Sequence, residues 1–389
     1  GAQGRWPIAV LLLVQLLNGM VISAQRYFFP IYVSEALGLT AVLASSFVSL
    51  AQVAGIVAAV VGGGLIDTLG RKWTLVVGLA GFVLSSLVYF ARAPWLVGGL
   101  WAVSGLAMTL ASLGAQSYLI RAAGPQSIGV VSAFYHWGFT LGGAFGSPVA
   151  GQILDAQGYS VFARLLTSLA ALNALLALGL MPRLNRARVR QAGVSWRVTL
   201  AGYLEIARHR RMMRLGLMRF LPTCYYGMSL VLIPLLIYAA QGTKTSVALF
   251  ATTSQIIATV AQLGTGRAAD RWGARMPTLI AMSVVSVAAI GQAVFARQAW
   301  GLFAFGCLGV AAAWSLSTLM PVIVSGSVPS ETQGRALGAL DLLWNLAMTL
   351  SVLVGGALVE IGTGLPFALA AVLSLGGVVV VVSFFGSRS

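Results

Sequence analysis

Two short stretches of the chain carry the same pattern: Gly63-Gly64-Leu65-Ile66-Asp67-Thr68-Leu69-Gly70-Arg71-Lys72 and Gly266-Arg267-Ala268-Ala269-Asp270-Arg271-Trp272-Gly273-Ala274-Arg275. A glycine, an aspartate, a second glycine and a basic residue recur 203 positions apart (266 − 63). Each stretch follows an apolar run long enough to cross a membrane. The repeat therefore predicts two similar six-helix halves, an arrangement that places a substrate site near the bilayer midplane between the repeats.

The composition is that of an integral membrane protein. The 389 residues are 59% hydrophobic and only 8% charged, with a mean hydropathy of +0.92, whereas a soluble domain carries about 25% charged residues. The 46 glycines fit membrane helices, because small residues let helices approach closely. So few charges cannot cover a soluble surface, and the net charge of +16 does not indicate a nucleic-acid partner.

Twelve stretches are long and apolar enough to be membrane spans. They cover residues 6–33, 40–66, 73–91, 95–120, 128–154, 161–181, 213–240, 246–268, 276–296, 299–327, 336–359 and 364–385. The runs are too long for barrel strands, so we expect an all-α protein of two pseudo-symmetric six-helix bundles.

The distribution of basic residues predicts the orientation. With the N-terminus inside, most of the 24 lysines and arginines fall on the inner side, and the outer side keeps Arg92, Arg164, Lys244 and Arg297. Because cytoplasmic loops are enriched in basic residues, we expect a multi-pass protein of the inner (plasma) membrane with both termini in the cytoplasm.

The long hydrophilic segment 183–212 divides the chain. It predicts an N-terminal bundle over 1–182 and a C-terminal bundle over 213–389. Apolar residues in the segment fall on one face of a possible helix and basic residues on another, which favours a helix lying on the anionic cytoplasmic leaflet. A solvated linker is the alternative interpretation.

The repeated pattern resembles the signature loop of the major facilitator superfamily. The resemblance extends over the chain, through the twelve spans, the basic central loop and the presence of the loop in both halves. It implies a secondary transporter that works by alternating access, as a symporter or an antiporter, with the loops latching the cytoplasmic ends of the halves in one state. Thr68 departs from the family, which usually has a basic residue there.

The chemistry of the loop residues fits such a gate. Gly70 and Gly273 suit a tight turn, and Asp67 and Asp270 favour the start of the following helix. The resemblance implies that Asp67 reaches Arg335 and that Asp270 reaches Arg121. The residues assigned to the cytoplasmic gate are Asp67, Gly70, Arg71, Lys72, Asp270, Arg271, Gly273, Arg275, Arg121 and Arg335. Alternatively, these charges only cap helices and set the topology.

An ionisable residue inside a span is a candidate for function, and Arg26 is the main one. Span 1 lines the central cavity in the family, and a guanidinium there would bind a carboxylate or phosphate bidentately. The segment around Arg26, with Leu37-Gly38-Leu39-Thr40 after it, resembles organic-anion branches of the family, although Gln25 stands where an acidic residue is often found. Alternatively, Arg26 snorkels to the outer interface.

His136 and Asp341 are candidates for proton coupling. A histidine titrates near neutral pH, and a carboxylate in an apolar site can exchange a proton during transport. Alternatively, His136 is a hydrogen-bonded structural residue. Asp341 follows Arg335 by six residues and can belong to the cytoplasmic gate instead.

The remaining substrate candidates come from the other spans that line the cavity in the family. They are polar or aromatic, as expected of a small-molecule site, and comprise Gln116, Tyr118, Tyr225, Tyr226, Trp314, Ser315 and Thr318. The glycine-rich run 142–151 loosely resembles a motif of proton-coupled drug exporters, but close helix packing or a proline kink explains it equally well.

These features predict a secondary transporter of a small organic solute, with an anion favoured by Arg26. The alternatives are a proton-coupled exporter of drugs or amphipathic compounds, an uncoupled facilitator, and a scaffold without transport. An enzyme is not expected, since the sequence contains no Walker-type phosphate loop and only two cysteines and two histidines. We expect no cofactor and no metal, a monomer, and lipid, the solute and protons as partners.

Overall fold

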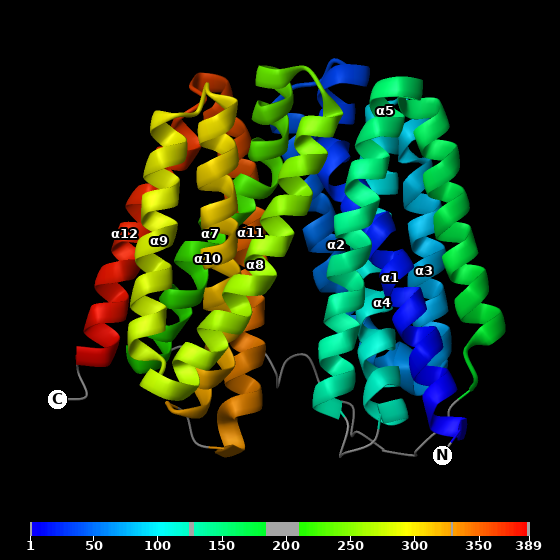
Figure 1. Cartoon of the computed structure of the whole chain (residues 1–389), viewed down its shortest axis with the longest axis horizontal. Coiled ribbons are helices and arrows are strands. Elements are labelled where there is room, and N and C mark those ends of the chain that lie inside the picture. Colours follow the sequence, from blue (N-terminus) through cyan, green and yellow to red (C-terminus); the bar gives the residue numbers. More distant parts are fainter. Residues whose placement is uncertain (1, 124–127, 184–209, 328–329, 387–389) are drawn as a thin grey trace. The chain divides into compact units, whose positions relative to one another are not determined.

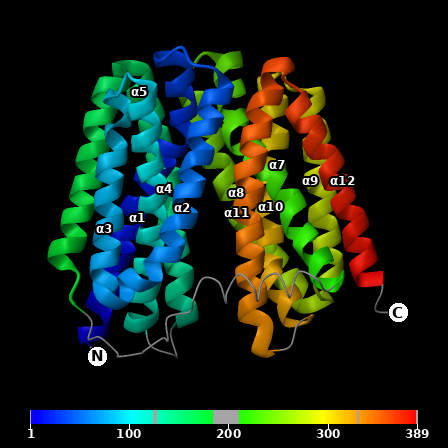
Figure 2. The same ribbon diagram turned by 180° about the vertical axis from the view of Figure 1, so that it is seen from behind.

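The computed structural model describes residues 2–123, 128–183, 210–327 and 330–386, which are helical apart from short connections (Figures 1 and 2). The elements are α1 (Ala2–Ile31), η1 (Tyr32–Ala36), α2 (Ala41–Thr68), α3 (Arg71–Ser86), η2 (Leu87–Phe90), α4 (Pro94–Ala123), α5 (Ile128–Leu180), α7 (Arg210–Gln241), α8 (Lys244–Trp272), α9 (Arg275–Val294), α10 (Ala299–Ser325), α11 (Ser330–Ile361) and α12 (Leu365–Gly386).

Eleven helices in this part of the chain are long and apolar enough to cross a membrane. The longest, α5, has 53 residues and is broken at Gly158, where φ is 72° and ψ is −175°. A straight helix of that length would measure about 80 Å, far more than the roughly 30 Å of a hydrocarbon core. The break at Gly158 therefore divides α5 into two spans, and the predicted twelve-helix fold is confirmed.

The chain forms two compact units. Unit 1 holds residues 1–189 together with 243–252, and unit 2 holds 190–242 and 253–389. The start of α8 thus packs with unit 1, although the rest of that helix belongs to unit 2. The surface helix expected within 183–212 falls on residues 184–209, which lie outside the described part.

The repeated loops have a similar backbone geometry in both units. Gly70 has φ 92° and Gly273 has φ 76°, values that glycine adopts without steric cost. The amide of each glycine donates to the carbonyl four residues earlier, Ile66 at 3.0 Å and Ala269 at 2.9 Å. Both predicted tight turns are present, and they join α2 to α3 and α8 to α9.

In unit 1, α1 lies closely against the first span of α5 along a row of glycines. A Cβ atom at Gly142 would collide with the backbone carbonyl of Leu16, and one at Gly146 would come within 2.7 Å of the Cα of Met20. Small residues of this kind let two membrane helices pack backbone to backbone. Close packing against α1 thus accounts for Gly142 and Gly146 of the glycine-rich run.

Unit 2 is arranged around α7, which packs against α10, α11 and α12, while α9 packs against α10 and α12. One difference between the two units concerns the second helix of each. In unit 1, α2 packs closely on α4, but among the described residues α8 makes no comparable contact with α10. The described hydrogen bonds from the first residues of α8 are instead made to unit 1.

Replacing Gly142 by alanine should destabilise the protein, because the new methyl group meets the rigid backbone of α1 at Leu16. Overpacking of this kind costs about 1–3 kcal/mol, and we expect a lower thermal unfolding midpoint in detergent. The matched control is Gly179→Ala in the second span of α5, where no atom lies within 4 Å of the new Cβ. Equal midpoints for the two variants would contradict close packing at Gly142.

Candidate functional site

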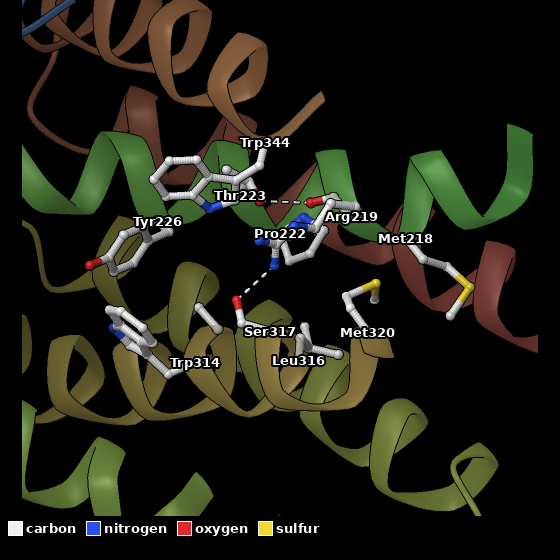
Figure 3. A pocket seen from close by; sticks show the side chains of 11 residues that line it. Met218, Arg219, Pro222, Thr223, Tyr226, Trp314, Leu316, Ser317, Met320 and Trp344 are labelled. Atoms are coloured by element: carbon white, nitrogen blue, oxygen red, sulfur yellow. Dashed lines mark hydrogen bonds between the residues drawn. The ribbon is translucent and has the colours of Figure 1, made fainter. Parts of the chain in front are cut away.

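A pocket in unit 2 lies between α7, α10 and α11 (Figure 3). Its volume is about 140 Å³, roughly ten times the space that one water molecule requires. The side chains that line it are mostly apolar or aromatic, with few polar groups: Met218, Arg219, Pro222, Thr223, Tyr226, Ala313, Trp314, Leu316, Ser317, Met320 and Trp344.

Helical periodicity places these residues on common faces. On α7, Arg219, Thr223 and Tyr226 are spaced at i, i+4 and i+7, and on α10, Trp314 and Ser317 are spaced at i and i+3. Residues with these spacings lie on one side of a helix. The hydroxyl of Thr223 donates to the carbonyl of Arg219 at 2.6 Å, so its proton is used within the helix although the side chain lines the pocket.

Arg219 is the charged group of the pocket. Only 15% of its side chain is exposed. Its Nη1 atom donates to Oγ of Ser317 at 2.7 Å, and its guanidinium lies 5.9 Å from the ring centre of Trp344. Such a cation–π contact stabilises a partly desolvated guanidinium.

The acidic partner of Arg219 is loosely placed. Nη2 of Arg219 and Oδ1 of Asp341 are 4.0 Å apart, and 77% of the Asp341 side chain is exposed. This distance is too long for a hydrogen bond. Because a guanidinium has five N–H donors, the described contacts leave Arg219 with capacity to bind an anionic or polar group that enters the pocket.

Aromatic side chains form the other end of the pocket. The rings of Tyr226 and Trp314 meet edge to face, with centroids 5.9 Å apart and an interplanar angle of 83°. Figure 3 shows Trp314 and Ser317 on one side of the pocket and Trp344 on the other, with Tyr226 between the two tryptophans. Trp314 is 41% exposed, so part of its indole surface is open to a bound molecule.

The structure brings some of the predicted residues together here. Tyr226 and Trp314 line the pocket, and Asp341 pairs with Arg219 at its edge. Tyr225, Ser315 and Thr318 do not line it. Tyr225 is fully buried against Gly309, Ser315 is buried, and the hydroxyl of Thr318 donates to the carbonyl of Trp314 at 3.1 Å.

The other predicted substrate residues lie in unit 1. Gln116 is exposed and donates to Oγ of Ser112 at 2.9 Å. Tyr118 is fully buried, and its hydroxyl donates to the carbonyl of Pro182 at 3.0 Å. His136 is exposed, with its ring edge to face on Tyr135 at 5.3 Å. None of these three lines the pocket of unit 2.

Arg26 is half-buried in a well-packed part of α1. The preceding Gln25 is buried, and its Nε2 donates to Oγ of Ser85 at 3.3 Å. The following aromatic rings are buried as well, and Phe29 stacks on Trp101 with ring centroids 3.5 Å apart. These rings lie in the interior of unit 1.

The described gate residues have different surroundings. Lys72 donates from Nζ to the carbonyl of Leu178 at 2.7 Å, a contact that satisfies a carbonyl near the end of α5. Arg121, Asp270, Arg271 and Arg275 are exposed. The side chains of Asp67 and Arg335 lie outside the part of the chain that the structure describes.

A second polar cluster in unit 1 holds the start of α8. The carboxylate of Asp155 on α5 accepts from the backbone N–H groups of Lys244 and Thr245, each at 2.8 Å, and from the Thr245 hydroxyl at 2.7 Å. Nζ of Lys244 lies 2.7 Å from Oε1 of Glu35, and the hydroxyl of Tyr159 donates to Oε2 of Glu35 at 2.6 Å. A carboxylate at this place satisfies the free amides of a helix start.

Sequence reasoning missed Arg219, Ser317 and Trp344. Arg219 stands six residues inside the expected span 213–240, but the orientation argument groups it with the inner basic residues that set the topology. The rule that a charge within a span indicates function identifies Arg219 as a candidate. For Ser317 and Trp344 the spacing of three residues from Trp314 and Asp341 is a signal, but only packing shows which helix faces meet.

The side chains that commonly bind metal ions are scattered in the described ranges. Within them, no group of three or more His, Cys, Asp or Glu side chains could hold a metal ion. Cys224 and Cys307 are free thiols and buried.

Removing the Asp155 carboxylate should loosen the start of α8, because three hydrogen bonds to residues 244 and 245 are lost. Loss of a helix-capping side chain costs about 1 kcal/mol. In Asp155→Ala we expect faster hydrogen exchange at the amides of 244–252, with Gln157→Ala, an exposed neighbour, as the control. Unchanged exchange in Asp155→Ala would show that this cap does not hold α8.

Comparison with known proteins places the chain in a family. The profile described as Major Facilitator Superfamily matches residues 11–235 and 215–389. Two solved structures of the nucleoside transporter NupG are similar in fold. The structure of a point mutant of NupG gives a TM-score of 0.79 at 18% identity and covers 98% of this chain and 99% of its own. The other gives 0.77 at 17% identity and covers 98% of both chains.

No match was found among curated proteins. At these identities the solved structures establish the fold alone. The family profile covers both halves of the sequence, in agreement with the repeated loops at Gly70 and Gly273. The chain is therefore a multi-pass membrane protein of the Major Facilitator Superfamily, a secondary transporter of a small solute.

Proposed function

We propose that this transporter carries a small organic anion and that Arg219 binds its negative group. The observation that supports this most is the state of Arg219. Its side chain is only 15% exposed in a mainly apolar pocket, and the carboxylate of its partner Asp341 is 4.0 Å away on a side chain that is 77% exposed. A desolvated guanidinium with donors to spare binds carboxylate or phosphate strongly.

Arg26 is a second candidate for the anion site. It is half-buried on α1 in unit 1, whereas Arg219 lies on α7 in unit 2. We rank Arg219 first because it lines a pocket and Arg26 does not. The same binding measurement on Arg26→Ala and Arg219→Gln separates the two.

An uncharged solute is the alternative, and two observations favour it. The structurally similar NupG proteins are named as nucleoside transporters, and the pocket contains Tyr226, Trp314 and Trp344, on which a planar base can stack. A nucleoside could accept hydrogen bonds from Arg219 but carries no negative charge. The affinity for a nucleoside would therefore depend less on Arg219 than the affinity for an anion.

Proton coupling is proposed for Asp341. Its carboxylate lies next to the guanidinium that would hold the substrate, so a substrate anion and an ionised Asp341 would compete for Arg219. Protonation of Asp341 would remove that competition, and proton and anion would then move together. His136 is exposed and lies in unit 1, so it has no comparable neighbour within the pocket.

Alternating access is proposed to use the polar cluster at the start of α8 and the cytoplasmic gate. In this cycle the start of α8 separates from Asp155, Glu35 and Tyr159, and on the cytoplasmic side Asp67 and Asp270 engage Arg335 and Arg121. We further propose an inner-membrane location with both termini in the cytoplasm, since the basic residues are concentrated on that side, and a monomer as the working unit.

Replacing Arg219 by glutamine should weaken the binding of organic anions to the purified protein by about tenfold or more, because a charge-assisted hydrogen bond is lost. Arg219→Lys should keep part of the affinity, since it keeps the charge without the planar fork. The dissociation constants for benzoate and uridine are measured by calorimetry.

The control for this measurement is Arg210→Gln, which removes the same charge from an exposed position of the same helix. Uridine binding that is equal in wild type and Arg219→Gln, with no benzoate binding in either, would support the nucleoside alternative and overturn the anion proposal.

Replacing Asp270 by asparagine should slow transport without changing binding, because the gate and not the pocket is altered. We expect about a fivefold lower initial uptake of the bound probe by proteoliposomes and an unchanged dissociation constant. Glu360→Gln, also a lost carboxylate in unit 2, serves as the control. Unchanged uptake in Asp270→Asn would assign Asp270 to helix capping and topology alone.

A further inference from the structure

The pocket of unit 2 has a charged end and an aromatic end, and this arrangement constrains the substrate further. We propose that the solute is an aromatic carboxylate, with its carboxylate on Arg219 and Ser317 and its ring against Trp314 and Tyr226. This inference rests on the proposed anion transport and adds the chemical class of the apolar part.

The charged end can hold one carboxylate. Nη1 of Arg219 already donates to Oγ of Ser317 at 2.7 Å, so the two side chains lie within reach of the same small group. The Ser317 hydroxyl accepts from Arg219 and keeps its own proton to donate. Together they offer a carboxylate a guanidinium and a hydroxyl donor, a pair that matches its oxygens.

The aromatic end favours a flat ring over an aliphatic chain. Tyr226 and Trp314 are already edge to face at 5.9 Å and 83°, and Trp314 keeps 41% of its surface exposed. A third ring placed there can stack on one partner while it meets the other edge on. Aromatic pairs of this geometry gain free energy beyond the area that they bury.

Trp344 connects the two ends. Its indole lies over the guanidinium of Arg219 with 5.9 Å between the ring centre and Cζ. Figure 3 shows it across the pocket from Ser317 and Trp314. A planar acid lying between Trp344 and Trp314 would keep its carboxylate at Arg219 and its ring between indoles.

The pocket fits a simple acid better than a cation or an amino acid. Asp341, the carboxylate at the edge of the pocket, is not among the lining residues and is 77% exposed. Arg219 repels a cation that enters the same space, although the aromatic rings of the lining can contact one. The lining therefore offers a charged hydrogen-bond donor to the carboxylate of a ligand, and only aromatic faces to an ammonium group.

The test compares four probes on the full-length purified protein: benzoate, cyclohexanecarboxylate, phenylalanine and uridine. Benzoate and cyclohexanecarboxylate share the carboxylate and have rings of similar size, so their affinity ratio isolates the aromatic contribution. We expect benzoate to bind about tenfold more tightly than cyclohexanecarboxylate, and more tightly than phenylalanine. Dissociation constants are measured by calorimetry.

Matched variants assign this ratio to the pocket. Trp314→Leu should bring the benzoate to cyclohexanecarboxylate ratio close to one, and Trp314→Phe should restore much of it. Trp300→Leu removes an exposed tryptophan from the other end of the same helix and should leave the ratio unchanged. The Phe variant and the unfolding midpoint of each variant separate loss of the ring from loss of the fold.

The outcomes distinguish a failure of the aromatic inference from a failure of the anion proposal. If both carboxylates bind equally and Arg219→Gln weakens both, the aromatic inference is overturned and the anion proposal stands. Tighter binding of phenylalanine than of benzoate likewise overturns the inference, because an ammonium partner is then present. If neither carboxylate binds and uridine does, the anion proposal itself fails.

Discussion

Placing the Arg219 guanidinium inside a membrane helix bundle is the constraint on which the site depends. An ionised group is expensive to bury unless other groups replace its water. Ser317 supplies a hydrogen bond and Trp344 an aromatic face. The carboxylate of Asp341 lies 4.0 Å from the guanidinium, and its side chain is largely exposed. The charge is thus tolerated without being neutralised at close range. A substrate anion would supply the partner that Arg219 lacks at close range. The affinity for the anion would then depend on how far the Arg219 side chain is buried.

The helix contacts described in the two units differ in the size of the side chains that make them. In unit 1, the backbone of α1 at Leu16 and Met20 lies against Gly142 and Gly146 of α5, so these helices approach backbone to backbone. In unit 2, the pocket between α7, α10 and α11 is lined by large side chains from all three helices, Arg219, Trp314 and Trp344 among them.

Much of the fold could be predicted because its signals are local in the sequence. Apolar length defines the spans, and a glycine at positive φ defines the turns at Gly70 and Gly273. The site is less predictable because it depends on which helix faces meet. Tyr225 and Tyr226 are neighbours of equal chemistry, yet about 100° of helical rotation buries the first and places the second in the pocket. For the same reason, the sequence assigns Arg219 to the basic residues that set the topology. Only the packing of α10 and α11 against α7 shows that its side chain is buried in a pocket.

The charges that hold the start of α8 are paired more completely than the charge in the pocket. Asp155 accepts three hydrogen bonds at 2.7–2.8 Å from Lys244 and Thr245, and Lys244 meets Glu35 at 2.7 Å. These groups hold the start of α8 on unit 1, and a ligand could gain little from groups already so occupied. Arg219 is more buried than Glu35, but its acidic partner is more distant. Since a protein gains no stability by leaving a desolvated charge loosely paired, such a residue is better explained by a partner that arrives and leaves.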